Sequence, residues 1–403
     1  MKDVLRGIRV LDFCWVGAGA LVTKLLAEHG ADVIKVESHA RPDNLRVAPP
    51  YRPGAEGLEG SGYFASRNND KRSLALDLRQ QKSREIAKQL AAQVDVVANN
   101  FRPGVMERWG LDYASVAEVN PSVVYLSMPM QGSDGPHRNF IGFGATIAAL
   151  AGLVELSGLP DRPPVGTGTH YPDHVPSPGH ALVALLATLR QRAATGRGRW
   201  IDVSQLESAA NMIGPALVAA ANGEPVPTRT GNRHPQHCPS GVFRCTGDES
   251  WIAVAARTDA EWTALVDVLQ TDELRDPRYE TFELRKQHED DVERIVGGHA
   301  AQRGCRELAE ALQAAGVPAY PVLSSKDVLD DEQLRARGFW RTLEHPVIGF
   351  MTAPSTPFVN NSERTGPVAA APLLGEHTSD VAHELLGLDD AQVETLTEEG
   401  VFW

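Results

Sequence analysis

The hydrophobic pattern near the start of the chain predicts a strand, a helix and a second strand in succession. Residues 8–13 form a short apolar run, residues 20–29 repeat apolar positions with a helical period, and residues 33–37 form a second apolar run. Gly30 is placed to end the helix. Two strands joined by one crossover helix make a βαβ unit, which implies a parallel sheet.

The same alternation continues further along the chain. We expect strands over residues 73–78, 94–98 and 123–128, with a helix over residues 81–93. Residues 99–104 follow one of these strands and turn into the next helix. Ligands bind at such strand-to-helix corners in open α/β sheets, so the pattern predicts a Rossmann-like domain with a site at this edge.

The middle of the chain, residues 161–207, predicts a loop, a long helix, a basic turn and a buried strand. Ser177 can cap the start of the helix, and Pro178 suits the first helical position, where no backbone donor is needed. Gly196 can end the helix.

The pattern changes after a largely apolar helix over residues 205–225. Residues 226–241 show no periodicity, and the following segment predicts strand, helix, helix and strand. We therefore expect a large Rossmann-like domain over residues 1–225, a small α+β domain over 226–325, and a C-terminal segment over 326–403 that returns to the large domain.

Composition restricts the possible partners. The chain has 403 residues and a net charge of −13, which argues against general binding to nucleic acid or to anionic membranes. No run is long enough to span a bilayer, and no signal peptide is recognised, so we expect a cytoplasmic protein. The four cysteines have no metal-ligand spacing, and Cys238 with two nearby histidines on a proline-rich loop is a poor site, so we expect no metal.

Asp173 lies in the loop before the predicted helix. Aimed at a helix N-terminus, its carboxylate would stay ionised and could act as a nucleophile. Alternatively, it only caps the loop or pairs with a nearby histidine, and spacing alone favours that local role.

The turn at Gly17 and Gly19 contains two of the three glycines of a dinucleotide-binding fingerprint, but Val22 stands at the third position. Glu37 follows at the distance of a ribose-binding acid. A tight turn before a packed helix is the simpler interpretation. Either way, its N–H groups could hold a phosphate or stabilise an oxyanion.

Five runs distributed over nearly the whole chain resemble the class III CoA-transferase family, which also contains formyl-CoA transferases, carnitine CoA-transferases and acyl-CoA racemases. They are GIRVLDF, LLAEHGADVIKVE, NDKRSLALDL, VANNFRPGVMERWGLDY and RQRAATGRGRWIDVSQLE. The resemblance implies that Asp173 attacks an acyl-CoA thioester to give a mixed anhydride. The acceptor carboxylate then attacks, and CoA returns by way of an aspartyl-CoA thioester. Gly17 would help to stabilise each tetrahedral centre.

The resemblance also implies a CoA site, with the CoA thioester as substrate and no permanently bound cofactor. Ser38 departs from relatives that have an arginine there, and Arg41 or Arg46 is the expected replacement. The implied CoA-binding residues are Val16, Lys71, Arg72, Leu74, Asn100, Phe101, Arg108 and Arg41.

Two positions separate the subclasses of the family. Phe143 stands where racemases carry a proton-transferring histidine, and Gly144 stands where formyl-CoA-type transferases carry a glutamate. Formyl-CoA-type transferases also have a glycine-rich flap where this chain has HPQHCPSG, residues 234–241, so an oxalate-sized pocket is not expected. Several segments look most like the branch that uses succinyl-CoA and 2-benzylsuccinate. We therefore expect transfer of CoA from an acyl-CoA such as succinyl-CoA to an aromatic or alicyclic carboxylic acid.

Three alternatives stay open at this point: an acyl-CoA racemase or epimerase, an NAD(P)-dependent reductase, and a non-catalytic partner subunit. The resemblance further implies two chains interlocked as a homodimer, or a hetero-oligomer with a homologous subunit.

Overall fold

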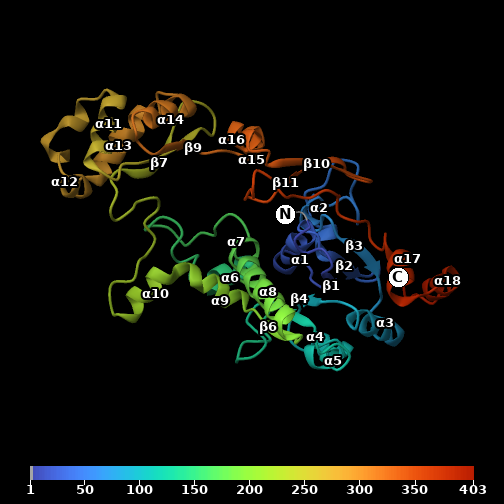
Figure 1. Ribbon diagram of the computed structural model, residues 1–403. Helices are drawn as coiled ribbons and strands as arrows, with labels where there is room; N and C mark the ends of the chain where they lie inside the picture. The colour runs from blue at the N-terminus through green and yellow to red at the C-terminus, as the bar shows by residue number, and fades with distance from the viewer. Residues whose placement is uncertain (1–2) are drawn as a thin grey trace. The chain divides into compact units, whose positions relative to one another are not determined.

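The computed structural model describes residues 3–403, which divide into two compact units. The first unit comprises residues 3–154, 166–226 and 333–403, and the second comprises residues 155–165 and 227–332. Residues 155–165, which lie within the first domain expected from the sequence, thus pack with the second unit. Figure 1 labels helices and strands of both units along the chain.

A six-stranded sheet organises the first unit, in the order β3-β2-β1-β4-β5-β6. All neighbouring pairs are parallel, which confirms the Rossmann-like α/β prediction. The strands are β1 (Arg9–Asp12), β2 (Asp32–Glu37), β3 (Arg72–Ala75), β4 (Val96–Asn99), β5 (Val124–Ser127) and β6 (Arg199–Asp202). The strand order reverses between β1 and β4, so their carboxyl ends form the crevice where ligands bind in such sheets.

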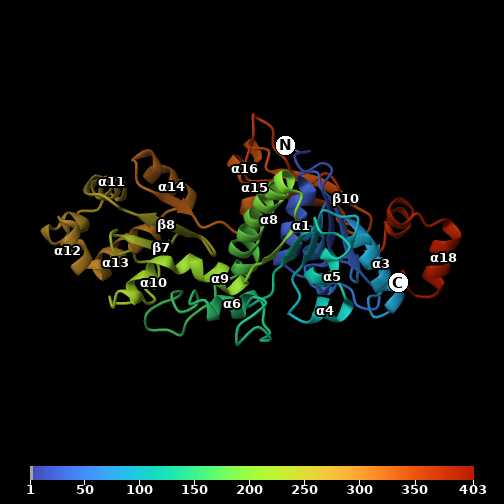
Figure 2. The same cartoon turned by 60° about the horizontal axis from the view of Figure 1, so that its bottom comes forward.

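Alternate residues of the strands build two cores on opposite faces of the sheet. On one face, Val10, Val33 and Val124 pack against α1 (Ala18–Glu28) and α8 (Pro176–Thr195). On the other, Leu11 and Ile34 pack against α3 (Gln81–Ala91), α4 (Val105–Trp109), α5 (Tyr113–Ala117) and the C-terminal helices. The C-terminal helices are α17 (Thr378–Val381), the π-helix Ala382–Leu386 and α18 (Asp390–Glu398). Figure 2 shows α1 and α8 running alongside each other.

The first unit also contains shorter helices and turns and a separate two-stranded sheet. They are the 3₁₀ turn Asn44–Val47, α2 (Gly62–Arg67), α6 (Gly144–Leu150), α7 (Tyr171–His174), α9 (Gln205–Ala210), the 3₁₀ turn Asn211–Ile213, α10 (Gly214–Ala221), α16 (Glu332–Ala336) and the antiparallel hairpin β10 (Trp340–His345) and β11 (Gly349–Pro354). The hairpin was not predicted from the sequence.

The second unit is an antiparallel sheet packed against helices. Its strands, β7 (Ser240–Arg244), β8 (Trp251–Ala255) and β9 (Ala319–Pro321), lie in the order β7-β8-β9. Its helices are α11 (Asp259–Leu269), α12 (Phe282–Gln287), α13 (Glu289–Ala300), α14 (Cys305–Ala314) and α15 (Ser325–Asp330), with 3₁₀ turns Glu273–Arg275 and Pro277–Tyr279. Ile252, Leu265 and Val292 belong to its core.

Three local predictions were wrong. Ser177 does not cap α8, because the helix already begins at Pro176 and the Ser177 side chain is buried inside its first turn. Asp173 lies on the one-turn helix α7 rather than in an irregular loop. Strand β6 is the edge of the sheet, so Trp200 is 48% exposed and not part of a buried strand.

Two properties of the described residues bear on possible partners. None of the described helices combines the length and the apolar character needed to cross a bilayer. Among residues 3–403, no three His, Cys, Asp or Glu side chains are arranged to hold a metal ion.

Candidate active site

The loops that follow β1 and β4 are tied together at the crevice where the strand order reverses. The side-chain amide of Asn100 accepts a hydrogen bond from the backbone N–H of Trp15 at 2.9 Å and donates one to the Trp15 carbonyl at 2.6 Å. The Trp15 and Phe101 rings meet edge to face at 5.3 Å. These contacts fix the floor of the crevice.

Val16 has a backbone conformation that is rare for its residue type. Its φ is +62°, in the left-handed region where a β-branched side chain is strained. The Val16 N–H donates to the carboxylate of Asp43 at 3.1 Å, and Asp43 is paired at 3.0 Å with the fully buried Lys35. Lys35 also donates to the Cys14 carbonyl at 2.7 Å. The buried ion pair therefore holds the strained loop in place, and such strain commonly occurs at functional sites.

A cavity opens beside this loop and contains Asp173. It encloses about 1450 Å³, part of it open to solvent. Most of its walls come from three segments of the first unit: residues 15–18, residues 100–102 and residues 138–147. The third segment contributes apolar side chains, including Phe140 and Phe143. Val16, Gly17, Asn100 and Phe101, all expected at the site, thus lie around one cavity with Asp173.

Two glycines let the backbone approach Asp173 closely. A β-carbon on Gly17 would lie 3.2 Å from Cβ of Asp173, and one on Gly144 would lie 2.5 Å from its Oδ2. The Gly144 N–H, in the first turn of α6, donates a hydrogen bond to the Asp173 carboxylate. A larger residue at position 144 would occupy the space of the carboxylate.

The Asp173 carboxyl group is buried, and burial raises its pKa above the ordinary aspartate value. The charge of His170 and the Gly144 hydrogen bond act in the opposite direction but do not reverse this effect. The expectation that a helix N-terminus would simply keep Asp173 ionised therefore needs correction. The helix whose N-terminus faces Asp173 is α6, not α8. The rise in pKa caused by desolvation is larger than the fall caused by the N–H donor of α6.

Gly19 has a packing role. A β-carbon there would lie 2.6 Å from Sγ of Cys14, so only glycine lets α1 pack this closely on the loop after β1. The first-turn N–H groups of α1, which begins after Gly17, have no partners within the helix. They are the donors expected to face a developing oxyanion.

A second group of polar side chains adjoins Asp173 and was not assigned a role from the sequence. The Tyr63 hydroxyl lies 3.1 Å from Nε2 of His174, the residue that follows Asp173. Burial and the positive charge of Arg67 lower the pKa of His174 to about 4, so its ring is neutral at neutral pH. Tyr63 and Arg67 are on α2, inside a loop-rich segment that has no periodicity to draw attention to them.

A smaller cavity lies at the carboxyl ends of β1, β2 and β3. Arg41 lies over the Trp15 ring, 5.8 Å from its centre, and contributes one cation to the lining. Arg79 contributes the other; it is paired with Asp77 at 2.8 Å, but unlike Arg46 its side chain is largely exposed. The remaining lining residues are mostly apolar: Phe13, Trp15, Val36, Glu37, Ser38, Leu76, Asp77, Leu78, Phe101 and Trp109.

Three of the residues expected to bind CoA lie elsewhere. Lys71 is buried, and its ammonium donates to Asp12, Thr23 and Asn68 side chains at 2.7–2.9 Å. Arg72 begins β3, at the opposite end of the strand from the cavity, where it pairs with Asp32 and Glu384. Leu74 is fully buried in the core. The residues just after β3, Leu76 to Arg79, line the cavity instead.

Three other candidate residues have definite surroundings. Arg46 is fully buried and paired with Glu37 at 2.9 Å and Glu59 at 2.7 Å, so it is not the free replacement for Ser38. Glu37 is thereby also engaged and is not free to bind a ribose. Arg108 is exposed on α4, outside the two cavities described above.

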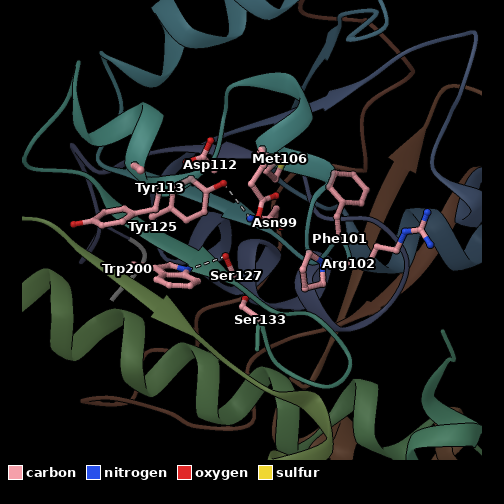
Figure 3. A pocket seen from close by; sticks show the side chains of 13 residues that line it. Asn99, Phe101, Arg102, Met106, Asp112, Tyr113, Tyr125, Ser127, Ser133 and Trp200 are labelled. Carbon is pink, nitrogen blue, oxygen red and sulfur yellow. Dashed lines mark hydrogen bonds between the residues drawn. The ribbon is translucent and has the colours of Figure 1, made fainter. Parts of the chain in front are cut away.

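A third cavity lies between the ends of β4, β5 and β6 and the helices α4 and α5 (Figure 3). Two hydrogen bonds cross it, from Asn99 to the Tyr125 hydroxyl at 3.4 Å and from the Trp200 indole to Ser127 at 3.0 Å. It shares Phe101 and Arg102 with the Asp173 cavity. Phe101 therefore lines all three cavities, just after β4, where the strand order reverses.

Comparison with known proteins identifies relatives over nearly the full length. Residues 5–378 match the family model described as CoA-transferase family III. The chain is 29% identical to the succinyl-CoA–D-citramalate CoA-transferase of Chloroflexus aurantiacus and 31% identical to the succinyl-CoA–L-malate CoA-transferase beta subunit of the same organism, each alignment covering 98% of both chains. The crystal structure of a CAIB/BAIF family protein from Brucella suis superposes with a TM-score of 0.87 at 29% identity, covering 96% of this chain and 100% of that one.

Proposed function

Because the chain belongs to CoA-transferase family III, a family of enzymes that exchange CoA between acyl-CoA thioesters and carboxylic acids, we propose that Asp173 is the nucleophile of this exchange and that succinyl-CoA is the donor. The observation that carries this proposal is the position of Asp173. It is the buried carboxylate of the large cavity, with Gly17 and Gly144 packed against it, and Gly144 leaves no room for a side chain.

The reaction can be written without any change of oxidation state. A carboxylate oxygen of Asp173 attacks the thioester carbonyl carbon, a C–O bond forms, and the C–S bond breaks to release CoA thiolate and leave a mixed anhydride. The thiolate attacks the aspartyl carbonyl carbon, releasing the donor acid and leaving aspartyl-CoA.

The second half of the reaction repeats these steps with the acceptor. Its carboxylate attacks aspartyl-CoA and expels thiolate, forming a second mixed anhydride. The thiolate then attacks the acceptor's carbonyl carbon. The products are the new thioester and the Asp173 carboxylate, and no net proton is taken up or released.

The surroundings of Asp173 suit these steps. Burial removes water that would otherwise solvate the nucleophile and hydrolyse an anhydride. The free N–H groups after Gly17 can stabilise the charge on each tetrahedral oxygen. The Gly144 N–H orients the carboxylate through its hydrogen bond.

We assign the CoA moiety to the smaller cavity and the crevice that leads from it. Val16, Asn100 and Phe101 would line the path of the pantetheine arm. Arg41 and Arg79 would interact with the phosphates, as guanidinium groups do with bound phosphate. Leu76, Leu78 and the neighbouring aromatic rings offer apolar surface for the adenine. Lys71, Arg72 and Leu74 have no part in this assignment, and Arg108 stays a prediction.

The acceptor is proposed to be a carboxylic acid with a bulky apolar part. Phe140 and Phe143 at the large cavity provide surface for the ring of an acid such as 2-benzylsuccinate. The relatives' names pair succinyl-CoA with D-citramalate and with L-malate, both dicarboxylic acids, which supports succinyl-CoA as donor here. Since Phe143 cannot move a proton, racemisation is disfavoured.

The test is a transfer assay with succinyl-CoA and a panel of acids: 2-benzylsuccinate, D-citramalate, L-malate and glutarate. We expect new acyl-CoA products from the wild type, and none above background from Asp173→Asn, which keeps the side-chain volume. Normal transfer by this variant would disprove the nucleophile assignment. Exchange of an α-proton with deuterated solvent, without any acceptor, would point to a racemase.

A further inference from the structure

Arg67, at the end of α2, is a partly buried cation without an anionic partner. Among residues 3–403, no carboxylate forms an ion pair with its guanidinium, and its Nε is shielded from solvent without a hydrogen-bond partner. The guanidinium carbon lies 5.6 Å from the centre of the Tyr63 ring. Leaving a charged donor partly desolvated and unpaired is costly, so the position calls for an anion.

Other buried cations of the chain are paired with carboxylates, which makes the unpaired Arg67 unusual. Arg46 is fully buried, but Glu37 and Glu59 each pair with it. Lys35 and Lys71, also fully buried, are paired with Asp43 and Asp12. Arg67 alone in this comparison has only an aromatic face as a partner.

Arg67 is linked to Asp173 through two side chains. Its guanidinium faces Tyr63, the Tyr63 hydroxyl is hydrogen-bonded to His174 at 3.1 Å, and His174 directly follows Asp173. A β-carbon on Gly17 would lie within 3.7 Å of both Nε2 of His174 and Cβ of Asp173. Burial raises the pKa of Tyr63, and the charges of Arg67 and Asp173 act on that hydroxyl in opposite directions. Burial and the charge of Arg67 both lower the pKa of His174, so these groups are close enough to interact electrostatically.

We propose that Arg67, assisted by the Tyr63 hydroxyl, binds the distal carboxylate of a dicarboxylic acyl group whose other end reacts at Asp173. This inference rests on the proposed function and extends it to substrate specificity. A guanidinium matches a carboxylate with two parallel hydrogen bonds, which an ammonium cannot reproduce. The neutral ring of His174 leaves Arg67 as the positive charge of this group. A monocarboxylic acyl group would leave Arg67 unpaired, so the site discriminates against it.

The experiment compares succinyl-CoA with butyryl-CoA, which has the same chain length but no second carboxylate. Single-turnover acylation of Asp173 is followed by mass spectrometry in the wild type, Arg67→Gln, Arg67→Lys and a control, Arg294→Gln. Arg294 is an exposed arginine on α13 with a 3.4 Å contact to Asp291.

We expect Arg67→Gln to lower the second-order rate constant for acylation by succinyl-CoA about 30- to 300-fold, with that for butyryl-CoA changed by less than about threefold. The rate constant of Arg67→Lys with succinyl-CoA should lie between those of the wild type and Arg67→Gln. Lysine keeps the positive charge but cannot form two parallel hydrogen bonds with a carboxylate. The Arg294 variant should match the wild type. An equal loss with both donors, or no loss with succinyl-CoA, would overturn the inference while leaving Asp173 chemistry intact. If the wild type acylates Asp173 with neither donor, it is the proposed function that fails.

If Arg67→Gln does not fold, Arg67→Lys is sufficient for the test. The quantity compared is the acylation rate constant with succinyl-CoA divided by that with butyryl-CoA. A ratio that falls at least about fivefold from the wild-type value supports the inference, and an unchanged ratio contradicts it.

Discussion

The backbone of Gly144 passes so close to Asp173 that a β-carbon on the glycine would lie 2.5 Å from Oδ2 of the carboxylate. The same glycine donates its N–H to that carboxylate. One backbone position therefore both makes room for the proposed nucleophile and orients it.

Gly144→Ala should displace the Asp173 carboxylate and lose its hydrogen bond. We expect the acylation rate to fall about 10- to 100-fold, since a misplacement of this size disturbs the attack geometry. Gly179→Ala is the matched control, because a β-carbon there meets nothing within 4 Å. Rapid-quench measurement of Asp173 acylation checks both variants, and a Gly144→Ala rate within twofold of the wild type would contradict the geometry.

Asp173→Asn should stabilise the protein at neutral pH. Burial raises the pKa of Asp173 in the folded state, so the folded protein carries a penalty for the charged form at pH values above that pKa. An amide carries no such penalty, and we expect Tm to rise by about 1–4 °C near pH 7.5. As pH falls through the folded-state pKa the wild type recovers this stability, so the difference should shrink. Calorimetry at several pH values tests this, and a lower Tm for the variant near pH 7.5 would contradict it.

His174 makes the opposite contribution to pH dependence. Its pKa falls from 6.5 to about 4 on folding, so the unfolded chain binds a proton that the folded protein does not. Stability is therefore lost as pH falls from 6.5 towards 4. Between about pH 7.5 and about pH 5, the fall in Tm should be roughly 2–4 °C smaller for His174→Gln than for the wild type. His180→Gln, at an exposed histidine of α8, is the control. Equal acid sensitivity of wild type and His174→Gln would refute this explanation.

Arg41→Gln and Arg79→Gln should weaken CoA binding without affecting the chemistry at Asp173. We expect KM for the acyl-CoA to rise about 5- to 50-fold for each variant, with kcat changed less than about threefold, since a phosphate contact contributes equally to ground state and transition state. Initial rates over a range of succinyl-CoA concentrations test this. A fall in kcat with unchanged KM would show that the smaller cavity does not hold CoA.

The sheet could be predicted from the sequence because its signals are local. The apolar runs of β1 and β2, with a helix ended by Gly30 between them, are sufficient to indicate a parallel βαβ unit. Pairing of β10 with β11 was missed because their burial pattern is mostly exposed or intermediate, and such strands lack the strong apolar alternation that marks a strand in the sequence.

The site was only partly accessible to sequence reasoning. Asp173 and the loop after β1 could be named from the family resemblance, but the role of Lys71 depends on a contact distant in the chain. Asp12 ends an apolar strand and is fully buried, so it requires a cation, and Lys71 supplies it. Tyr63 and Arg67 were not recognised as one group with His174, because Tyr63 on α2 meets His174 on α7, 111 residues later in the chain.

The most direct test of the central claim follows an oxygen atom. In the proposed route the acceptor carboxylate gives one oxygen to Asp173 when the second anhydride is cleaved. The wild type would be turned over with succinyl-CoA and an acceptor acid labelled with oxygen-18, then digested with trypsin. Fragment ions of the peptide spanning residues 139–190 distinguish Asp173 from Glu155 and Asp161, the other acidic side chains in it. We predict label in Asp173, none in the other two, and none in a control without succinyl-CoA. Sustained transfer with no label in Asp173 would contradict the mechanism.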